Sequence, residues 1–296
     1  MFCKFSLILI FIIAGAILFP CYIANASNSL LNPDVFVSSD NLSQADTLLV
    51  AVKNETKEIT GSLGSVKLRF FRNDNDKDWV AITGMTIDKK PGRYKLSINV
   101  PGKAPFEKYI TVSKQNFTVT ALTVTPELYE KGYTVANIIA KTGEENKTLS
   151  KILNVITPKS YISKPFIYPL SEIKDVGSFG NIRKSKSYQI QHLGVDLSAS
   201  LNTPVYSAND GKVVFVKSMQ DYGNTIVVDH GLGVYSLYLH LNSFNVKKGQ
   251  SVKQGDVLGL SGNTGYSIGP HLHFSIKVRG ASLDPLKFIN TTQSEW

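Results

Sequence analysis

Cysteine is almost missing from this sequence of 296 residues, where it occurs twice, as Cys3 and Cys21. Both positions fall in the first 26 residues, a segment that we expect to be removed on export. The mature chain would then contain no thiol. It would have no disulfide, no cysteine nucleophile and no thiolate metal ligand, so any catalytic chemistry must use other side chains.

Acidic residues are absent from these same 26 residues, and Lys4 is the one charged residue there. An apolar run from Phe5 to Phe19 follows, and Ala24-Asn25-Ala26 has the small-x-small pattern that signal peptidases cleave. These features predict a signal peptide over residues 1–26 and an exported protein, in the periplasm, elsewhere in the cell envelope or outside the cell. An uncleaved N-terminal anchor is the alternative.

Long apolar runs are lacking in the rest of the chain. None approaches the roughly 20 apolar residues that a membrane helix needs, so we expect no membrane span after signal cleavage. Acidic residues are also in the minority, 23 against 32 basic residues, which gives a formal net charge of +9. A basic chain suits an anionic partner such as a wall polymer, a lipid headgroup or nucleic acid, and export argues against nucleic acid.

The length of the chain suits two domains, and most of it shows short strands separated by turn signals. Residues 27–125 predict an immunoglobulin-like β-sandwich without histidine, with Asp74 and Asp76 in an acidic turn. Residues 126–167 predict a partly helical connector, with apolar residues at helical spacing in one long helix or, because Gly143 interrupts the pattern, in one or two short helices. Residues 168–296 are rich in predicted strands again. The predicted fold class is therefore mainly β, with the N-terminal β-sandwich, the connector and a C-terminal β-rich domain.

Histidine is confined to this last domain, where all five lie: His192, His230, His240, His271 and His273. Alternate residues of a strand share a face. Three segments would each present a polar face opposite an apolar one: His192, Gly194, Asp196 and Ser198; Ser236, Tyr238 and His240; His271, His273, Ser275 and Lys277. We expect the three apolar faces to pack inward and the polar faces to form one cleft floored by a sheet.

Four histidines and one aspartate that converge without cysteine favour a divalent transition metal, with zinc first. A catalytic zinc takes three protein ligands and a water, so two histidines would be left for proton transfer. A single histidine on a strand is more often a surface or hydrogen-bonded residue than a ligand. The hypothesis of a metal site depends on the joint occurrence of these residues on matching strand faces.

The segment His192-Leu193-Gly194-Val195-Asp196 resembles the H-x-G-x-D motif of the M23 zinc metallopeptidases, the LytM and lysostaphin type. Gly269 to Phe274 resembles the G-P-H-L-H-F motif of the same family. Intervening stretches such as Leu237 to Leu241 and Gly262 to Gly265 are also similar, and the likeness covers residues 178–288. In this family the position of Ser275 often carries an acidic residue.

The resemblance implies a Zn²⁺ site formed by His192, Asp196 and His273, with His240 and His271 as the catalytic pair. The pair would activate the zinc-bound water, hydrogen-bond the oxyanion and pass a proton to the leaving amine. The implied protein is an exported zinc metalloendopeptidase that hydrolyses peptide cross-links of bacterial peptidoglycan. His230, at the end of an apolar strand, is expected to have a structural or supporting role.

Three other functions are compatible with parts of the sequence. The first is a catalytically silent wall-binding protein that regulates or activates other cell-wall hydrolases. The second is a carrier hairpin over Val246 to Gly259, which gives the histidines no role. The third is a serine hydrolase around Ser261, where the G-x-S-x-G motif fails at its last position. The scissile bond, the oligomeric state and whether the connector blocks the cleft stay open.

Overall fold

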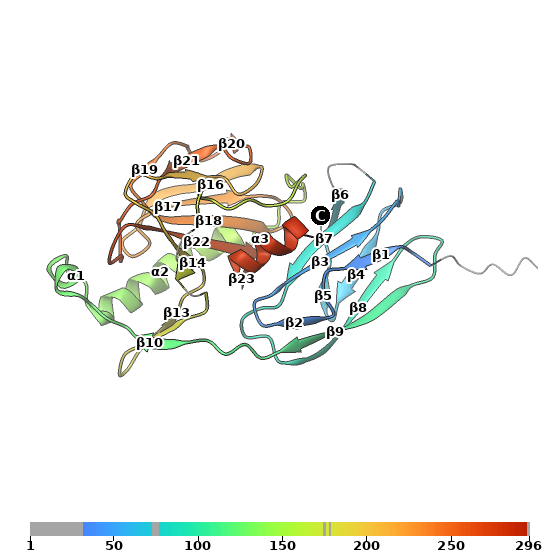
Figure 1. Cartoon of the computed structure of the whole chain (residues 1–296), viewed down its shortest axis with the longest axis horizontal. Helices are drawn as coiled ribbons and strands as arrows, with labels where there is room; N and C mark the ends of the chain where they lie inside the picture. The colour runs from blue at the N-terminus through green and yellow to red at the C-terminus, as the bar shows by residue number, and fades with distance from the viewer. Residues whose placement is uncertain (1–31, 73–76, 174–175, 178, 295–296) are drawn as a thin grey trace, which may run out of the picture. The chain divides into compact units, whose positions relative to one another are not determined.

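The computed structural model describes residues 32–72, 77–173, 176–177 and 179–294, which belong to one compact unit. The predicted signal peptide over 1–26 and the acidic turn at Asp74 and Asp76 lie outside the described residues. The described residues are mainly β, as predicted, with three helices among them (Figure 1). None of the described helices is long and apolar enough to cross a membrane.

The strands before residue 114 form two sheets that share one apolar cluster. The first sheet has the order β1 (Val35–Val37), β3 (Thr47–Val52), β7 (Trp79–Gly84) and β6 (Phe70–Arg72). The second has the order β2 (Asn41–Ser43), β9 (Phe106–Ser113), β8 (Gly92–Asn99), β4 (Thr60–Leu63) and β5 (Val66–Lys67). Leu48 of β3 packs with Leu96 of β8 and Ile110 of β9 in this cluster. The immunoglobulin-like topology stays a prediction.

The C-terminal half is built on one large sheet. Its order is β11 (Val176–Gly177), β14 (Val195–Ser198), β22 (His271–Val278), β18 (Val234–Leu241), β17 (Asn224–Asp229), β16 (Gly211–Ser218) and β20 (Ser251–Val252), with β23 (Ala281–Leu283) also paired to β22. Two smaller sheets have the orders β15 (Pro204–Tyr206), β21 (Val257–Leu260), β19 (Ser243–Phe244), and β10 (Val119–Ala121), β12 (Ile182–Lys184), β13 (Gln189–Gln191).

Strand β3 belongs to two cores at once, because alternate residues of a strand face opposite ways. Leu49 and Ala51 face the main apolar cluster of the C-terminal half, which also contains Leu283. Gly84 permits this close approach, since a Cβ there would lie 2.5 Å from the Leu283 side chain. The N-terminal sheet that contains β3 and β7 is therefore packed directly against β23.

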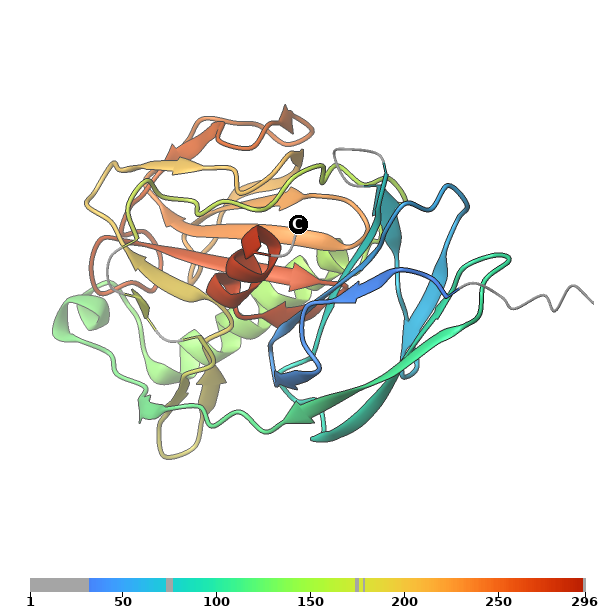
Figure 2. The ribbon, with the colours of Figure 1, turned by 45° about the vertical axis from the view of Figure 1, so that its right-hand side comes forward.

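Helix α2 (Val135–Leu153) is the main element of the connector, after the short α1 (Pro126–Glu130). It begins at a capping box in which Thr134 and Asn137 satisfy each other's backbone N–H groups. Gly143 does not interrupt it, so of the two predicted alternatives, one long helix or one or two short helices, residues 135–153 form the long helix. Figures 1 and 2 show α2 running along the sheet of β18 and β22, and Leu149 and Leu153 pack there.

The chain after α2 lies extended along the C-terminal half before it enters the large sheet. Tyr161 N donates to His230 O at 2.9 Å, and Ile167 N donates to Ala208 O at 3.0 Å. Phe166 is fully buried and packs edge-on against Phe288 of α3 (Pro285–Ser294), with ring centroids 4.9 Å apart. The predicted boundaries of the connector, at residues 126 and 168, stay a prediction.

Candidate active site

Strands β14 and β22 form the floor of the site. They pair antiparallel with Asp196 opposite His273 and Ser198 opposite His271, so these side chains share a face. The residues between them, such as Leu197 and Leu272, are fully buried in the main core. The alternation predicted for these two strands is confirmed.

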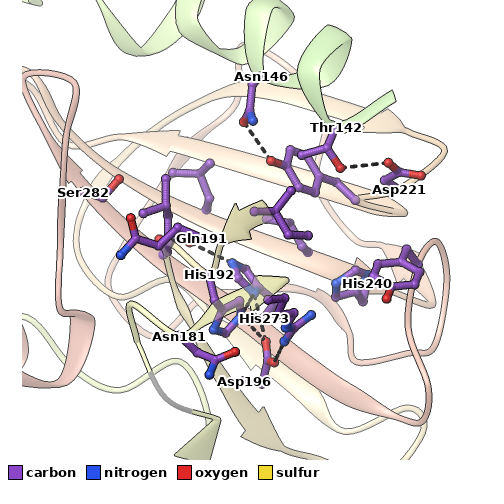
Figure 3. Close-up of a pocket in the computed structure, with 18 of the residues that line it drawn as sticks. Thr142, Asn146, Asn181, Gln191, His192, Asp196, Asp221, His240, His273 and Ser282 are labelled. Atoms are coloured by element: carbon purple, nitrogen blue, oxygen red, sulfur yellow. Dashed lines mark hydrogen bonds and ion pairs between the residues drawn. The ribbon is translucent and has the colours of Figure 1, made fainter. Parts of the chain in front are cut away.

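Three potential ligand atoms meet above this floor (Figure 3). His192 Nε2 lies 2.9 Å from Asp196 Oδ1 and 2.9 Å from His273 Nδ1, and His273 Nδ1 lies 2.9 Å from Asp196 Oδ1. His192 precedes β14 and is held by its backbone, since its N–H donates to Asn181 O at 2.8 Å. These are the three residues for which the sequence predicted metal ligation, and the structure brings them to one point.

Ser275 fixes which nitrogen of His273 carries the proton. Its Oγ donates to Leu193 O at 3.0 Å and therefore accepts from His273 Nε2–H, 2.9 Å away. The lone pair of His273 is then on Nδ1, which faces His192 and Asp196. Gly194 makes room for this contact, because a Cβ there would lie 2.3 Å from Ser275 Oγ and 2.4 Å from His273 Nε2.

The electrostatics of the cluster favour an anionic Asp196 and a neutral His273. Burial would raise the pKa of Asp196, but the side chains of His192 and His273 beside it outweigh burial and hold that pKa well below its usual range. Arg183 of β12 adds an ion pair to Asp196 Oδ2 at 3.3 Å. Burial lowers the pKa of His273 to about 4. The carboxylate of Asp196 and the Nδ1 lone pair of His273 are therefore available for metal binding at neutral pH.

His240 and His271 form a second pair beside the first cluster, with ring centroids 4.8 Å apart. His240 Nδ1 donates to Thr264 O at 2.8 Å, and His271 Nδ1 donates to Gly269 O at 2.8 Å. His271 Nε2 is 3.6 Å from Asp196 Oδ1. Burial lowers the pKa of His240 to about 3, with the nearby His271 and His273 adding to the effect. In the neutral form His240 has Nε2 as a proton acceptor.

The predicted alternation is wrong for residues 234–241. Tyr238, expected on the cleft face, is in the main core, whereas Leu237 and Leu239 line the cavity. The register explains this, because Leu239 lies opposite His273 and shares its face. His240 reaches the cleft since its φ is +61°, which breaks the strand alternation at that residue. A left-handed histidine in a site is strain that its surroundings must hold in place.

A cavity of about 1010 Å³ lies over the side chains of His192, Asp196, His240, His271 and His273. Its lining includes residues of β14, β18, β22, α2 and the loops before β14 and β22, and Figure 3 shows α2 opposite the ligand cluster. From α2, Thr142 Oγ donates to Asp221 Oδ2 at 2.9 Å, and the Tyr222 hydroxyl donates to Asn146 Oδ1 at 2.7 Å. The connector helix is thus a wall of the cavity and does not fill it.

Glu145 of α2 is a buried carboxylate with three backbone partners. It accepts N–H groups from Gln220 at 2.6 Å, Asp221 at 3.1 Å and Tyr222 at 3.0 Å. Tyr222 O in turn accepts the backbone N–H of His240 at 3.1 Å. The sequence did not indicate Glu145 or Arg183, because both act across the fold and neither belongs to a local motif.

His230 lies away from the cavity, fully buried in the core. Its Nδ1 donates to Asp210 O at 2.7 Å, and Ser236 Oγ lies 2.8 Å from its Nε2. Burial lowers its pKa to about 4. Tyr188, the tyrosine nearest before the first motif, is 43% exposed in the β12–β13 hairpin and does not line the cavity.

Comparison with known proteins matches the segment that carries these side chains to a described family. The sequence profile of "Peptidase family M23" matches residues 190–285, which contain all five histidines. Peptidoglycan DD-endopeptidase ShyA of Vibrio cholerae serotype O1 is 45% identical over 96 residues, 32% of this chain and 22% of that protein. DD-carboxypeptidase/endopeptidase Mpg of Neisseria meningitidis serogroup B is 39% identical over 95 residues, again 32% and 22%.

A solved structure with a similar fold covers most of the chain. It is that of a putative peptidase M23 from Pseudomonas aeruginosa, with a TM-score of 0.57, 23% identity and coverage of 82% of this chain and 93% of that chain. At this identity the likeness concerns the fold alone. The two curated relatives are matched over about a fifth of their own length.

Proposed function

We propose that this chain, whose residues 190–285 match peptidase family M23, is an exported zinc metalloendopeptidase that hydrolyses peptide cross-links of bacterial peptidoglycan. The main support is the convergence of His192, Asp196 and His273 beside the His240–His271 pair in one large cavity. The printed names of the relatives, a peptidoglycan DD-endopeptidase and a DD-carboxypeptidase/endopeptidase, support the substrate class.

The donor set fits zinc. Two imidazole nitrogens and one carboxylate oxygen that face each other at 2.9 Å repel one another unless a proton or a cation lies between them. Three such donors and a free position are what catalytic zinc takes, so we assign His192 Nε2, Asp196 Oδ1 and His273 Nδ1 as the ligands. Bound there, zinc supplies Lewis acidity toward water and the scissile carbonyl.

The remaining two histidines have complementary tasks in this proposal. His240 has its Nδ1–H fixed on Thr264, so its Nε2 takes the proton of the attacking water and delivers it to the leaving amine. His271, held at Nδ1 by Gly269, hydrogen-bonds the developing oxyanion when it is protonated at Nε2. The basic character of the chain, with a net charge of +9, supports binding to an anionic wall.

The test is the release of soluble peptides from purified peptidoglycan. The purified protein is assayed as isolated, after treatment with a chelator, and after zinc is added back. We expect release as isolated, loss with the chelator and recovery with zinc. Binding to the wall with zinc bound and no release under any condition would favour the catalytically silent regulator.

A further inference from the structure

Lys277 lines the same cavity and has no part in the chemistry proposed so far. It lies on β22, on the same face as His271, His273 and Ser275. It lies four positions after His273, which is about 13 Å along a strand that rises about 3.3 Å per residue. Ser282, its neighbour on β23, marks the end of the cavity away from His240 in Figure 3.

The surroundings of Lys277 offer it one hydroxyl and no carboxylate. Its Nζ donates to Ser282 Oγ, and no ion pair joins it to any acidic residue that the structure describes. The acidic side chains that line the cavity are Asp196 and Asp221. Both are engaged elsewhere, Asp196 by the histidines and Arg183, and Asp221 by Thr142.

Among the described residues, Lys277 therefore has no counterion, although it lines a cleft. The other basic residue of the lining, Arg183, has its carboxylate partner at 3.3 Å. Burial lowers the pKa of Lys277 to about 8, which still leaves most of it charged at neutral pH. A partly buried charge without a partner is costly, and a ligand that brings a carboxylate relieves this cost through a charge-assisted hydrogen bond.

Resting on the proposed function, we infer that Lys277 and Ser282 form a subsite that binds one free carboxylate of the peptide substrate. The carboxylate lies about four extended residues from the scissile amide, since an extended peptide rises by about 3.3 Å per residue. The Ser282 hydroxyl accepts from Lys277 and has its own proton to donate to the same carboxylate. The subsite makes the enzyme prefer acidic peptides.

The substrates for the test are soluble cross-linked muropeptides and the same muropeptides with their carboxylates amidated by carbodiimide and methylamine. Both are hydrolysed by the wild-type protein, Lys277→Met, Lys277→Arg and the control Lys217→Met. Lys217 is an exposed lysine of β16 that does not line the cavity, so its removal changes the net charge equally. Zinc content and the melting temperature show that each variant is folded.

For the wild type we expect amidation to raise KM about tenfold or more, with kcat little changed, because the subsite is remote from the reacting atoms. Lys277→Met should show the higher KM on both substrates, Lys277→Arg a smaller change, and Lys217→Met none. Equal KM values for the two substrates with an active wild type would overturn the subsite and leave the proposed function intact. No hydrolysis of either substrate by the zinc-loaded wild type would overturn the proposed function, and the subsite with it.

Discussion

Individual hydrogen bonds orient the side chains of the cluster formed by His192, Asp196 and His273. Ser275 holds the Nε2–H of His273, and replacing it with alanine removes that acceptor. Such supporting contacts typically alter metal affinity by about tenfold to hundredfold. We expect Ser275→Ala to bind zinc about tenfold more weakly in a chelator competition. Ser198→Ala, an exposed serine of β14, is the control, and equal affinities for the two variants would contradict this role of Ser275.

A single glycine makes room for the same cluster. Gly194→Ala would place a Cβ 2.4 Å from His273 Nε2, so either the strand or the ligand must move. We expect loss of most zinc binding and peptide release. Gly143→Ala is the control because a Cβ there meets nothing within 4 Å. A zinc content equal to that of the wild type would show that the site tolerates the added methyl group.

His230 couples stability to pH. Its folded pKa of about 4 lies below the ordinary value of 6.5, so below pH 6.5 the unfolded chain binds a proton that the folded chain does not. Stability therefore falls as the pH drops from about 6.5 toward 4. Between pH 7 and pH 5 we expect the wild type to lose on the order of 2 kcal/mol more unfolding free energy than His230→Gln. Urea unfolding at the two pH values measures this, and equal losses would contradict it.

At the scale of elements, the sequence predicted β14 and β22 well and β18 badly. The first two are regular strands, so a period of two is enough to assign their faces. In β18 the apolar face is covered by α2, and His240 leaves the alternation through a left-handed φ of +61°. Neither the packing of α2 against β18 nor the φ of His240 can be predicted from the local sequence pattern. Strand parity put both Tyr238 and His240 in the cleft; His240 does line the cavity, whereas Tyr238 lies in the main core.

The contacts of α2 could not be predicted, because they join residues more than 70 positions apart. Glu145 accepts three backbone N–H groups of the loop that precedes β17, and its neighbour Glu144 is an exposed partner of Lys141. We expect Glu145→Ala to lower the free energy of unfolding by about 1–3 kcal/mol, since buried donors lose their acceptor. Glu144→Ala should change it by less than about 0.5 kcal/mol. Equal effects in chemical unfolding would show that the carboxylate does not secure the loop.

At the scale of the whole molecule, part of the apolar surface of residues 168–296 is buried by residues that precede this region. Leu149 and Leu153 of α2 cover the apolar half of β18, and Leu49 and Ala51 of β3 pack into the main core. Composition and strand spacing predicted a mainly β chain, but not that β3 serves two cores. We expect the isolated fragment 168–296 to melt below the protein that retains residues 27–167, because this apolar surface is exposed. An equal melting temperature would show that the fragment is an independent domain.

The most direct test of the central claim separates metal binding from proton transfer within one site. Asp196→Asn and His240→Ala are purified with the wild type, and zinc content and release of soluble peptides from peptidoglycan are measured for each. The account predicts zinc and release in the wild type, neither in Asp196→Asn, and zinc without release in His240→Ala. Release by His240→Ala at the wild-type rate, or full zinc content in Asp196→Asn, would contradict it.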